Sequence, residues 1–257
     1  MGNNSYENLP STSYAQKGKD AVLSPRNNGQ LALGEITIEN ASGGAVDVGI
    51  GYKVADGRWK AGQYVDATTT YTDDTTDAQD SDTNDFALTT LTNNDGFIVQ
   101  SFEKFNLLGL TKTTAGNGAS TLEYNYWNGS AWVALTTKET LGDLTGTGDV
   151  FLAFLAPHDW AKSSASAATG IDTNMYALRV RATTAPVTTA ALASLLWIGV
   201  LPFFKESLAN NTQFSVDRET DPIIFPGGAG LLPYFGGTAN ANNMVSARYR
   251  TIGEAPA

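Results

Sequence analysis

Residues 122–135 read LEYNYWNGSAWVAL, and this stretch is the clearest indicator of fold class in the chain. Its first half alternates apolar and polar residues, a period of two that is typical of a strand with one buried face. The Asn128-Gly129 pair supplies the positive backbone angle of a tight hairpin turn, and Trp127 and Trp132 stand on either side of it. The stretch therefore predicts an antiparallel β-hairpin.

The two-residue period recurs along the chain. In residues 46–54, Val, Ile and Tyr alternate with Gly, Asp and Lys, and Asp56-Gly57 follows as a turn signal. We therefore expect a hairpin whose second strand runs near Trp59–Val65. Further turn signals recur roughly every 8 to 12 residues, up to a last expected strand at Met244–Ile252, and this spacing is typical of a sandwich or barrel. Only Ala185–Leu196 approaches a helical pattern, and its Pro and Thr residues allow a short helix at most.

Composition excludes several classes of function. The 257-residue chain has no Cys and one His, which rules out disulfide scaffolds, thiolate zinc sites, Cys nucleophiles and paired-His metal sites. The 16 Lys and Arg against 26 Asp and Glu give a net charge of −10. No nucleic-acid partner is expected, because clustered Lys and Arg are needed to bind a phosphate backbone. The longest apolar run, Ala190–Phe204, is too short for a membrane helix, so no membrane partner is expected either.

Acidic residues gather in one segment, residues 66–95, and no Lys or Arg lies between Lys60 and Lys104. Like charges so close together favour a solvated loop. Asp80, Asp82 and Asn84 have the spacing of the first ligands of a calcium loop, but the Gly and the bidentate Glu that such a loop needs further on are missing. We interpret the segment as an exposed acidic loop, with a weak cation site at these three residues as the alternative.

Four regions are expected along the chain. Residues 1–30 are rich in Asn, Ser, Gly and Lys and are predicted to be an N-terminal arm, either a flexible tail or a segment that lies on a neighbouring subunit. Residues 31–85 are predicted to be a β-hairpin region with the acidic loop, and residues 86–204 a β-sandwich module. Residues 205–257 are predicted to be C-terminal strands and loops packed on the same body. The fold class is therefore all-β: an antiparallel, jelly-roll-like β-sandwich with an extended arm and an irregular Pro/Gly-rich C-terminal region.

Four short elements occur in order within the predicted module. They are the tryptophan hairpin at 122–135, the turn at Asp143–Gly148, the corner Pro157-His158-Asp159-Trp160 and the arginine-bearing strand Tyr176–Arg181. Together they resemble a β-sandwich module of tailed-bacteriophage virion proteins, found in baseplate, fibre and capsid-surface components. The resemblance covers about residues 86–200, and the chain departs from the usual pattern at Ala177, where an aromatic residue is common.

The resemblance implies a non-enzymatic virion structural protein with no cofactor. We expect a capsid decoration (cement) protein at the capsid surface, a homotrimer that binds the major capsid protein and stabilises the phage head by bridging capsomers. The alternative is a tail, baseplate or fibre component that binds host-surface glycan. A third hypothesis, an enzyme acting on host polysaccharide, finds little in the residues, because the acidic residues gather in the 66–95 segment, where nothing apolar would raise the pKa of a carboxyl group. Nucleophilic catalysis finds no more, because His158 is accompanied by no nucleophile motif.

Candidate binding residues follow from these hypotheses. Apolar strands are expected to supply a subunit interface, and the candidates in them are Leu195, Trp197, Ile198, Phe203 and Phe204. A ring that stacks on glycan is expected at Trp59 or Tyr64, with Trp59 the better candidate for exposure. No catalytic or cofactor-binding residue is predicted.

The tryptophans and arginines of the module have a structural interpretation. Trp127, Trp132 and Trp160 are expected in the core, since an indole buries a large area and dominates the packing of a small sandwich. Arg179 and Arg181 lie two residues apart and therefore share one face of their predicted strand. We expect them to pair with acidic neighbours.

Overall fold

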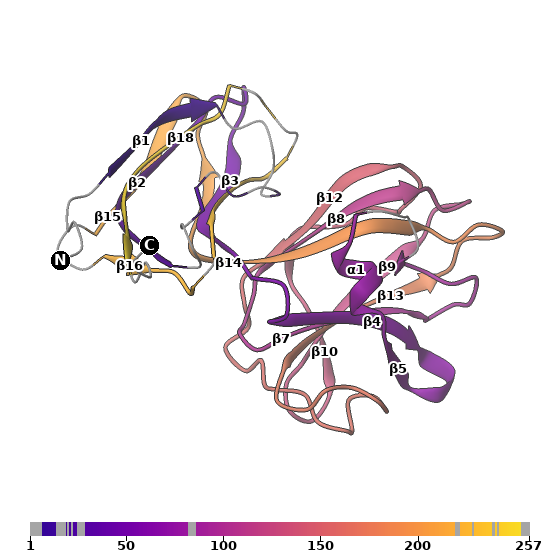
Figure 1. Ribbon diagram of the computed structural model, residues 1–257. Helices are drawn as coiled ribbons and strands as arrows, with labels where there is room; N and C mark the ends of the chain where they lie inside the picture. The colour runs from indigo at the N-terminus through magenta and orange to yellow at the C-terminus, as the bar shows by residue number, and fades with distance from the viewer. Residues whose placement is uncertain are drawn as a thin grey trace. The chain divides into compact units, whose positions relative to one another are not determined.

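The computed structural model describes residues 7–13, 19, 21, 23–24, 29–81, 86–218, 222–227, 229–237, 240 and 242–252, with side chains left out at 10–13 and 251. The chain forms two compact units (Figure 1). The first consists of Met1–Ala55 and Gly199–Ala257, and the second of Asp56–Ile198. This division differs from the expected regions, because strands from both ends of the sequence pair with one another in the first unit.

A five-stranded antiparallel sheet forms much of the first unit. Its strand order is β1-β18-β2-β15, and β16 pairs with β2 as well. The strands are β1 (Glu7–Ser13), β2 (Gln30–Asn40), β15 (Thr212–Asp217), β16 (Ile223–Ile224) and β18 (Met244–Ile252). In β2, Ile36 and Ile38 alternate with partly exposed polar residues and are fully buried in the core of this unit. The expected N-terminal arm therefore contains an edge strand of its own chain at Glu7–Ser13, and residues 1–6 lie outside the described residues.

A second group of paired strands, centred on β3, belongs to the same unit. Strand β3 (Val46–Lys53) pairs with β17 (Leu231–Phe235) and with the later part of β14 (Leu192–Leu208). β14 passes through both units: from Gly199 onward it pairs with β3, whereas Leu192 and Ala193 pair with β6 (Phe86–Ala87) in the second unit. In the third sheet of the protein, β14 is the strand between β8 and β3.

The second unit holds a six-stranded antiparallel sheet with the order β10-β9-β13-β7-β4-β5. Its strands are β4 (Trp59–Val65), β5 (Thr70–Asp73), β7 (Gly96–Ser101), β9 (Thr121–Trp127), β10 (Trp132–Ala134) and β13 (Tyr176–Thr184). Besides β6, which pairs with β14, the other strands of this unit precede β14 in the third sheet, in the order β11-β12-β8. They are β8 (Leu107–Thr114), β11 (Thr137–Glu139) and β12 (Gly148–Phe154).

Helical structure is scarce. The described residues hold one α-helix, α1 (Thr75–Gln79), and a 3₁₀ turn at Asp66–Thr68. α1 lies beside β4 (Figure 1), and Gln79 donates a hydrogen bond to the Trp59 carbonyl. No helix in the described part of the chain has the length and apolar character needed to cross a membrane. The chain is thus mostly β, with three antiparallel sheets.

Several expected elements are confirmed and one pairing is wrong. The tryptophan hairpin forms as β9 and β10, and β4 and β18 have the expected bounds. Gly57 has the positive φ (81°) of a turn, but β3 and β4 do not form a hairpin: β4 pairs with β5 and β7 instead. The expected acidic loop contains the strand β5 and the helix α1, and Asp95 within it is buried.

Candidate functional site

The tryptophan hairpin has the geometry that its sequence predicts. Gly129 adopts a φ of 101°, and the Asn128 side-chain oxygen accepts hydrogen bonds from the backbone N–H groups of Ser130 and Ala131. The rings of Trp127 and Trp132 meet edge to face with centroids 5.5 Å apart. Trp127 is buried, and the Trp132 indole N–H donates to the Ala167 carbonyl at 3.0 Å. The hairpin thus holds the segment that precedes β13 against the sheet.

The Pro157-His158-Asp159-Trp160 corner is packed against the same hairpin. Trp160 is 3% exposed, and its indole N–H donates to the Ala177 carbonyl at 3.1 Å. The rings of four neighbours surround it at centroid distances of 5.2 to 6.4 Å, namely Phe105, Tyr126, Phe154 and Tyr176. The Tyr126 hydroxyl donates to the Asp159 carboxylate at 2.9 Å. Trp160 therefore joins the corner to β9 and β13.

Arg179 on β13 lies inside the unit, only 6% exposed. Its guanidinium lies 4.7 Å from the Trp132 ring centroid and 5.1 Å from that of Tyr64. It donates to the Tyr64 hydroxyl at 3.1 Å and to the Asn125 side-chain oxygen at 3.0 Å. Both acceptors are uncharged, and the Nε atom has no acceptor among the described residues. The buried cation is thus held by two rings and two neutral hydrogen-bond partners.

Arg181, two residues further along β13, completes a closed network with Arg179. It forms ion pairs with Glu123 at 2.9 Å and with Asp66 at 3.3 Å. Asp66 also accepts from the Tyr64 hydroxyl, and Glu123 accepts from the Asn125 side-chain nitrogen. We call these six residues the arginine network: Tyr64, Asp66, Glu123, Asn125, Arg179 and Arg181. Its two cations and two carboxylates balance, so the cluster as a whole carries no net charge.

The pKa shifts in the arginine network follow from burial and these contacts. Burial lowers the pKa of Arg179 and raises that of Tyr64. Hydrogen bonds from Asn125 and Arg181 lower the pKa of Glu123 despite its partial burial. Burial also acts to lower the pKa of Arg181, but its contacts with Glu123 and Asp66 outweigh this effect and raise it. The contacts between Glu123 and Arg181 thus favour the charged forms of this pair, whereas burial opposes the charge on Arg179.

Substitution of Glu123 by Gln is expected to alter the acid sensitivity of folding. Because the pKa of Glu123 is lowered in the folded state, its ionised form stabilises the fold above the unfolded pKa of about 4.3, and this contribution disappears as pH falls through the folded pKa. Glu123→Gln should therefore lower the free energy of unfolding at pH 7 by about 1 kcal/mol. The difference between variant and parent should shrink progressively as the pH falls below about 4.3 in a series of urea titrations. A difference that is constant over this range would contradict the assignment.

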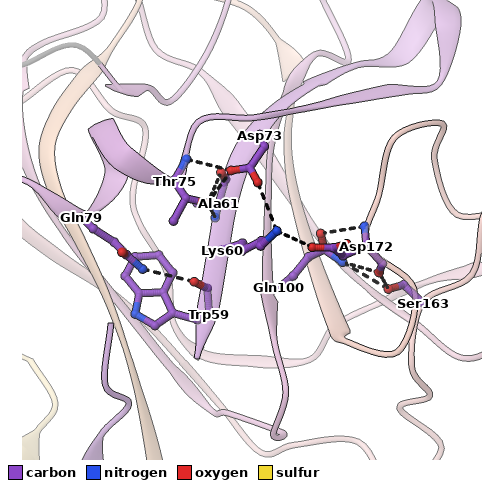
Figure 2. Close-up of polar contacts among 9 residues, drawn as sticks. All are labelled: Trp59, Lys60, Ala61, Asp73, Thr75, Gln79, Gln100, Ser163 and Asp172. Carbon is purple, nitrogen blue, oxygen red and sulfur yellow. Dashed lines mark hydrogen bonds and ion pairs between the residues drawn. The ribbon is translucent and has the colours of Figure 1, made fainter. Parts of the chain in front are cut away.

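A second polar cluster lies at the other end of β4 (Figure 2). Lys60 Nζ is 2.6 Å from a carboxylate oxygen of Asp172 and 3.4 Å from one of Asp73. The Gln100 side-chain N–H donates to the Asp172 carbonyl at 2.9 Å, and the Ser163 hydroxyl donates to the same carbonyl at 2.7 Å. The bond to Asp172 raises the pKa of Lys60. These contacts fasten the segment that leads into β13 to strands β4 and β7.

A shallow groove of about 340 Å³ lies beside the corner. Its lining includes Tyr126, Lys138, Leu155, His158 and Asp159. Leu155 is the exposed apolar residue among them, at 50% exposure, and Tyr126 directs its hydroxyl to Asp159. The groove thus has the single histidine of the chain, the Asp159 carboxylate and the Thr136 hydroxyl in its lining.

The residues predicted to contact glycan are not exposed. Trp59 is 0% exposed, and Tyr64 is 2% exposed within the arginine network. Asp56, Gly57 and Arg58 precede Trp59 and suggested a surface turn, but β4 begins at Trp59 itself and directs the ring inward. Neither ring therefore presents a face for stacking on a sugar.

The predicted interface residues lie along β14 and have mixed burial. Trp197 and Ile198 are fully buried within the chain, and Leu195 is partly buried. A Cβ atom on Gly109 would lie 2.2 Å from the Trp197 ring, which explains the glycine in β8. In the first unit, Phe203 packs against the core and Phe204 stacks on Tyr234 with centroids 6.1 Å apart.

The predicted cation site is only partly covered by the structure. Asp82 and Asn84 lie outside the described residues, and Asp80 follows α1, where its N–H donates to the Thr76 carbonyl. Among the described residues, no group of three or more His, Asp or Glu is placed to hold a metal ion.

Sequence reasoning missed most partners in these clusters. Arg179 and Arg181 do share one network, as their spacing predicts, but Tyr64 and Asp66 come from the distant strand β4 and the turn that follows it. The glycine at position 96 was one available signal of a close neighbouring strand. A Cβ atom at this position would lie 2.7 Å from the Arg181 Cα and 2.1 Å from the Val180 carbonyl oxygen. The glycine in β7 thus marks the close approach of β13.

The arrangement as a whole is suited to holding strands and loops together. The Pro157–Trp160 corner, the arginine network and the polar cluster around Lys60 each join segments that are far apart in the sequence. A comparison with family models, curated proteins and solved structures finds no match to this chain in any of the three.

Proposed function

We propose that this chain is a non-enzymatic structural protein of a tailed-bacteriophage virion, a decoration protein at the capsid surface. One observation carries the proposal: the elements on which the resemblance rests are interlocked as parts of a scaffold. Trp160 joins the corner to β13, and Arg179 joins β13 to the Asn125 side chain of the hairpin. In the Asp143–Gly148 turn, the Asp143 carboxylate accepts from the Thr145 N–H and hydroxyl. Their polar groups are engaged in building the fold.

The finer fold, a jelly-roll-like β-sandwich, is part of this proposal. Two aromatic contacts in the second unit support face-to-face packing of its sheets. Phe86 of β6 meets Phe97 of β7 edge to face, with centroids 5.8 Å apart. Phe154 of β12 lies 5.9 Å from Trp160, whose indole N–H donates to β13. Aromatic pairs between two sheets are expected in the core of a sandwich.

The proposed mechanism is mass action. A protein that binds the assembled shell but not its separated subunits stabilises the shell, by an amount that grows with the logarithm of its free concentration above the Kd. The partners would be the major capsid protein and further copies of this chain, with a homotrimer as the expected assembly. The glycan-binding alternative in the tail has less support, because Trp59 and Tyr64 are buried.

Binding to undecorated heads tests the proposal directly. The purified chain is added to undecorated heads of the phage that encodes it, and shell disruption is followed on heating. We expect saturable binding and a higher disruption temperature, and a chain that does not bind would contradict the proposal. A chain shortened by residues 1–6 keeps β1 and is the matched variant. Weaker binding of this variant is expected if residues 1–6 of the arm contact the capsid, and unchanged affinity would exclude these six residues from the mechanism.

A further inference from the structure

The edge strand β15 (Thr212–Asp217) is unusually open to pairing. Its ladder with β2 is regular over all six residues, from Thr212 opposite Asn40 to Asp217 opposite Glu35. It contains no Pro and no Lys, the residues that commonly protect sheet edges. No other strand of the described part of the chain pairs with its outer side. β15 therefore has the features of an edge that accepts another strand.

The other strands at sheet edges are protected or short. β1 contains Pro10, and its register with β18 shifts between Leu9 and Thr12. β17 contains Pro233. In the second unit, β10 and β11 have three residues each and β5 has four. Since proline, irregular register and shortness all discourage pairing, β15 is the exception among the described edges.

The outward hydrogen-bonding groups of β15 can be assigned from the ladder. The N–H of Arg218, just past the strand, donates to the Gly34 carbonyl of β2. Because backbone groups alternate in direction along an antiparallel strand, Phe214 and Val216 also direct theirs toward β2. Gln213 and Ser215 therefore direct their N–H and carbonyl groups away from the sheet.

We propose that β15 pairs with β15 of a second copy of this chain, antiparallel about a two-fold axis at Phe214. Gln213 of each copy then faces Ser215 of the other, and the two pairs exchange four backbone hydrogen bonds. Phe214 faces its own counterpart in the closer, non-hydrogen-bonded position, where aromatic pairs stabilise a sheet. The proposal does not depend on the virion function, and a two-fold pair through β15 in solution would leave other surfaces of each chain for the three-fold assembly expected on the capsid.

The side chains of β15 suit this self-pairing. Phe214 and Val216 face the core of the first unit but are only partly buried, so pairing would cover apolar surface. Thr212 would face Val216, and no two like charges stand directly opposite each other in this register. On the outer face, Gln213 donates to Glu39 and Ser215 contacts Thr37, contacts that pairing leaves intact. The second copy is thus a self-complementary partner.

Substitution of Ser215 by Pro tests the pairing. Proline removes the outward N–H but no bond to β2, so the edge strand itself should persist. We expect the full-length chain to be a dimer in sedimentation equilibrium, and Ser215→Pro to raise its dissociation constant roughly ten- to hundredfold. Ser215→Ala, which loses only the hydroxyl, is the matched control and should dimerise like the parent. A monomeric parent, or a dimer unaffected by Ser215→Pro with an unchanged circular dichroism spectrum, would overturn the proposal.

Two double variants test the register. Gln213→Lys with Ser215→Lys places like charges opposite each other across the axis, whereas Gln213→Lys with Ser215→Glu places opposite charges there. We expect the first to dissociate the dimer and the second to tighten it at low salt. Equal dissociation constants for the two would contradict an axis at Phe214. Hydrogen exchange at Gln213 and Ser215 should also quicken on dilution of the parent, and exchange independent of concentration would oppose the pairing.

Discussion

Truncation of Trp160 to Ala is expected to lower the free energy of unfolding of the second unit by about 3–5 kcal/mol. The indole is 3% exposed and has four aromatic neighbours, so its removal leaves a cavity where the corner, β9, β12 and β13 meet. The Ala177 carbonyl also loses the hydrogen bond that it accepts from the indole N–H. Urea titration followed by far-ultraviolet circular dichroism measures the change.

Two further variants isolate the cause of that loss. Trp160→Phe keeps an aromatic ring but lacks the N–H, so it should lose about 1–3 kcal/mol. Leu155→Ala truncates a residue in the same corner that is 50% exposed, and it should change stability by about 0.5 kcal/mol or less. If Trp160→Ala were no more destabilising than Leu155→Ala, the corner would not be part of the core.

Substitution of Arg179 by Ala is expected to cost about 3 kcal/mol or more, because buried acceptors lose their donor. Asn125 and Tyr64 each lose a charged hydrogen bond, and the rings of Trp132 and Tyr64 lose the cation between them. The remaining network would hold Arg181 against two carboxylates, and its charge would no longer balance. Thermal and urea unfolding of the purified variant measure the cost.

Arg181→Ala is the matched control for Arg179. The Arg181 side chain is more exposed and its ion pairs face solvent, so its removal should cost about 1 kcal/mol. The comparison of Arg179→Ala with Arg181→Ala also distinguishes a structural role of Arg179 from a role in ligand binding. Residues of a binding or catalytic site commonly reduce stability, and their truncation often leaves a protein equally or more stable. An Arg179→Ala variant as stable as the parent would therefore contradict the structural assignment and favour a ligand site.

Local features of this fold could be predicted from sequence. The period of two and the Asn128-Gly129 turn predict the β9–β10 hairpin, and β18 occupies Met244–Ile252 as expected. Both signals act over a few residues, where side-chain direction and backbone preference decide the structure. The same holds for Arg179 and Arg181, whose spacing alone places them on one face.

Partners at long range could not be predicted. The Asp56-Gly57 turn is present, yet the strands before and after it belong to different sheets. A turn signal indicates a change of direction but not which strand will pair. Trp59 follows three polar or flexible residues and still lies in the core. Arg179 has neutral partners because β9 and β4 bring Asn125 and Tyr64 to it, and neither neighbour is near it in sequence.

The number of copies in purified virions tests the central claim most directly. Under the proposed function the chain is encoded by a tailed phage, and quantitative mass spectrometry of particles of that phage compares its amount with that of the major capsid protein. A decoration protein of the head should be present in hundreds of copies per particle, in a fixed ratio to the capsid subunits. A few to a few dozen copies would place the chain in the tail, and its absence from virions would contradict the structural role altogether.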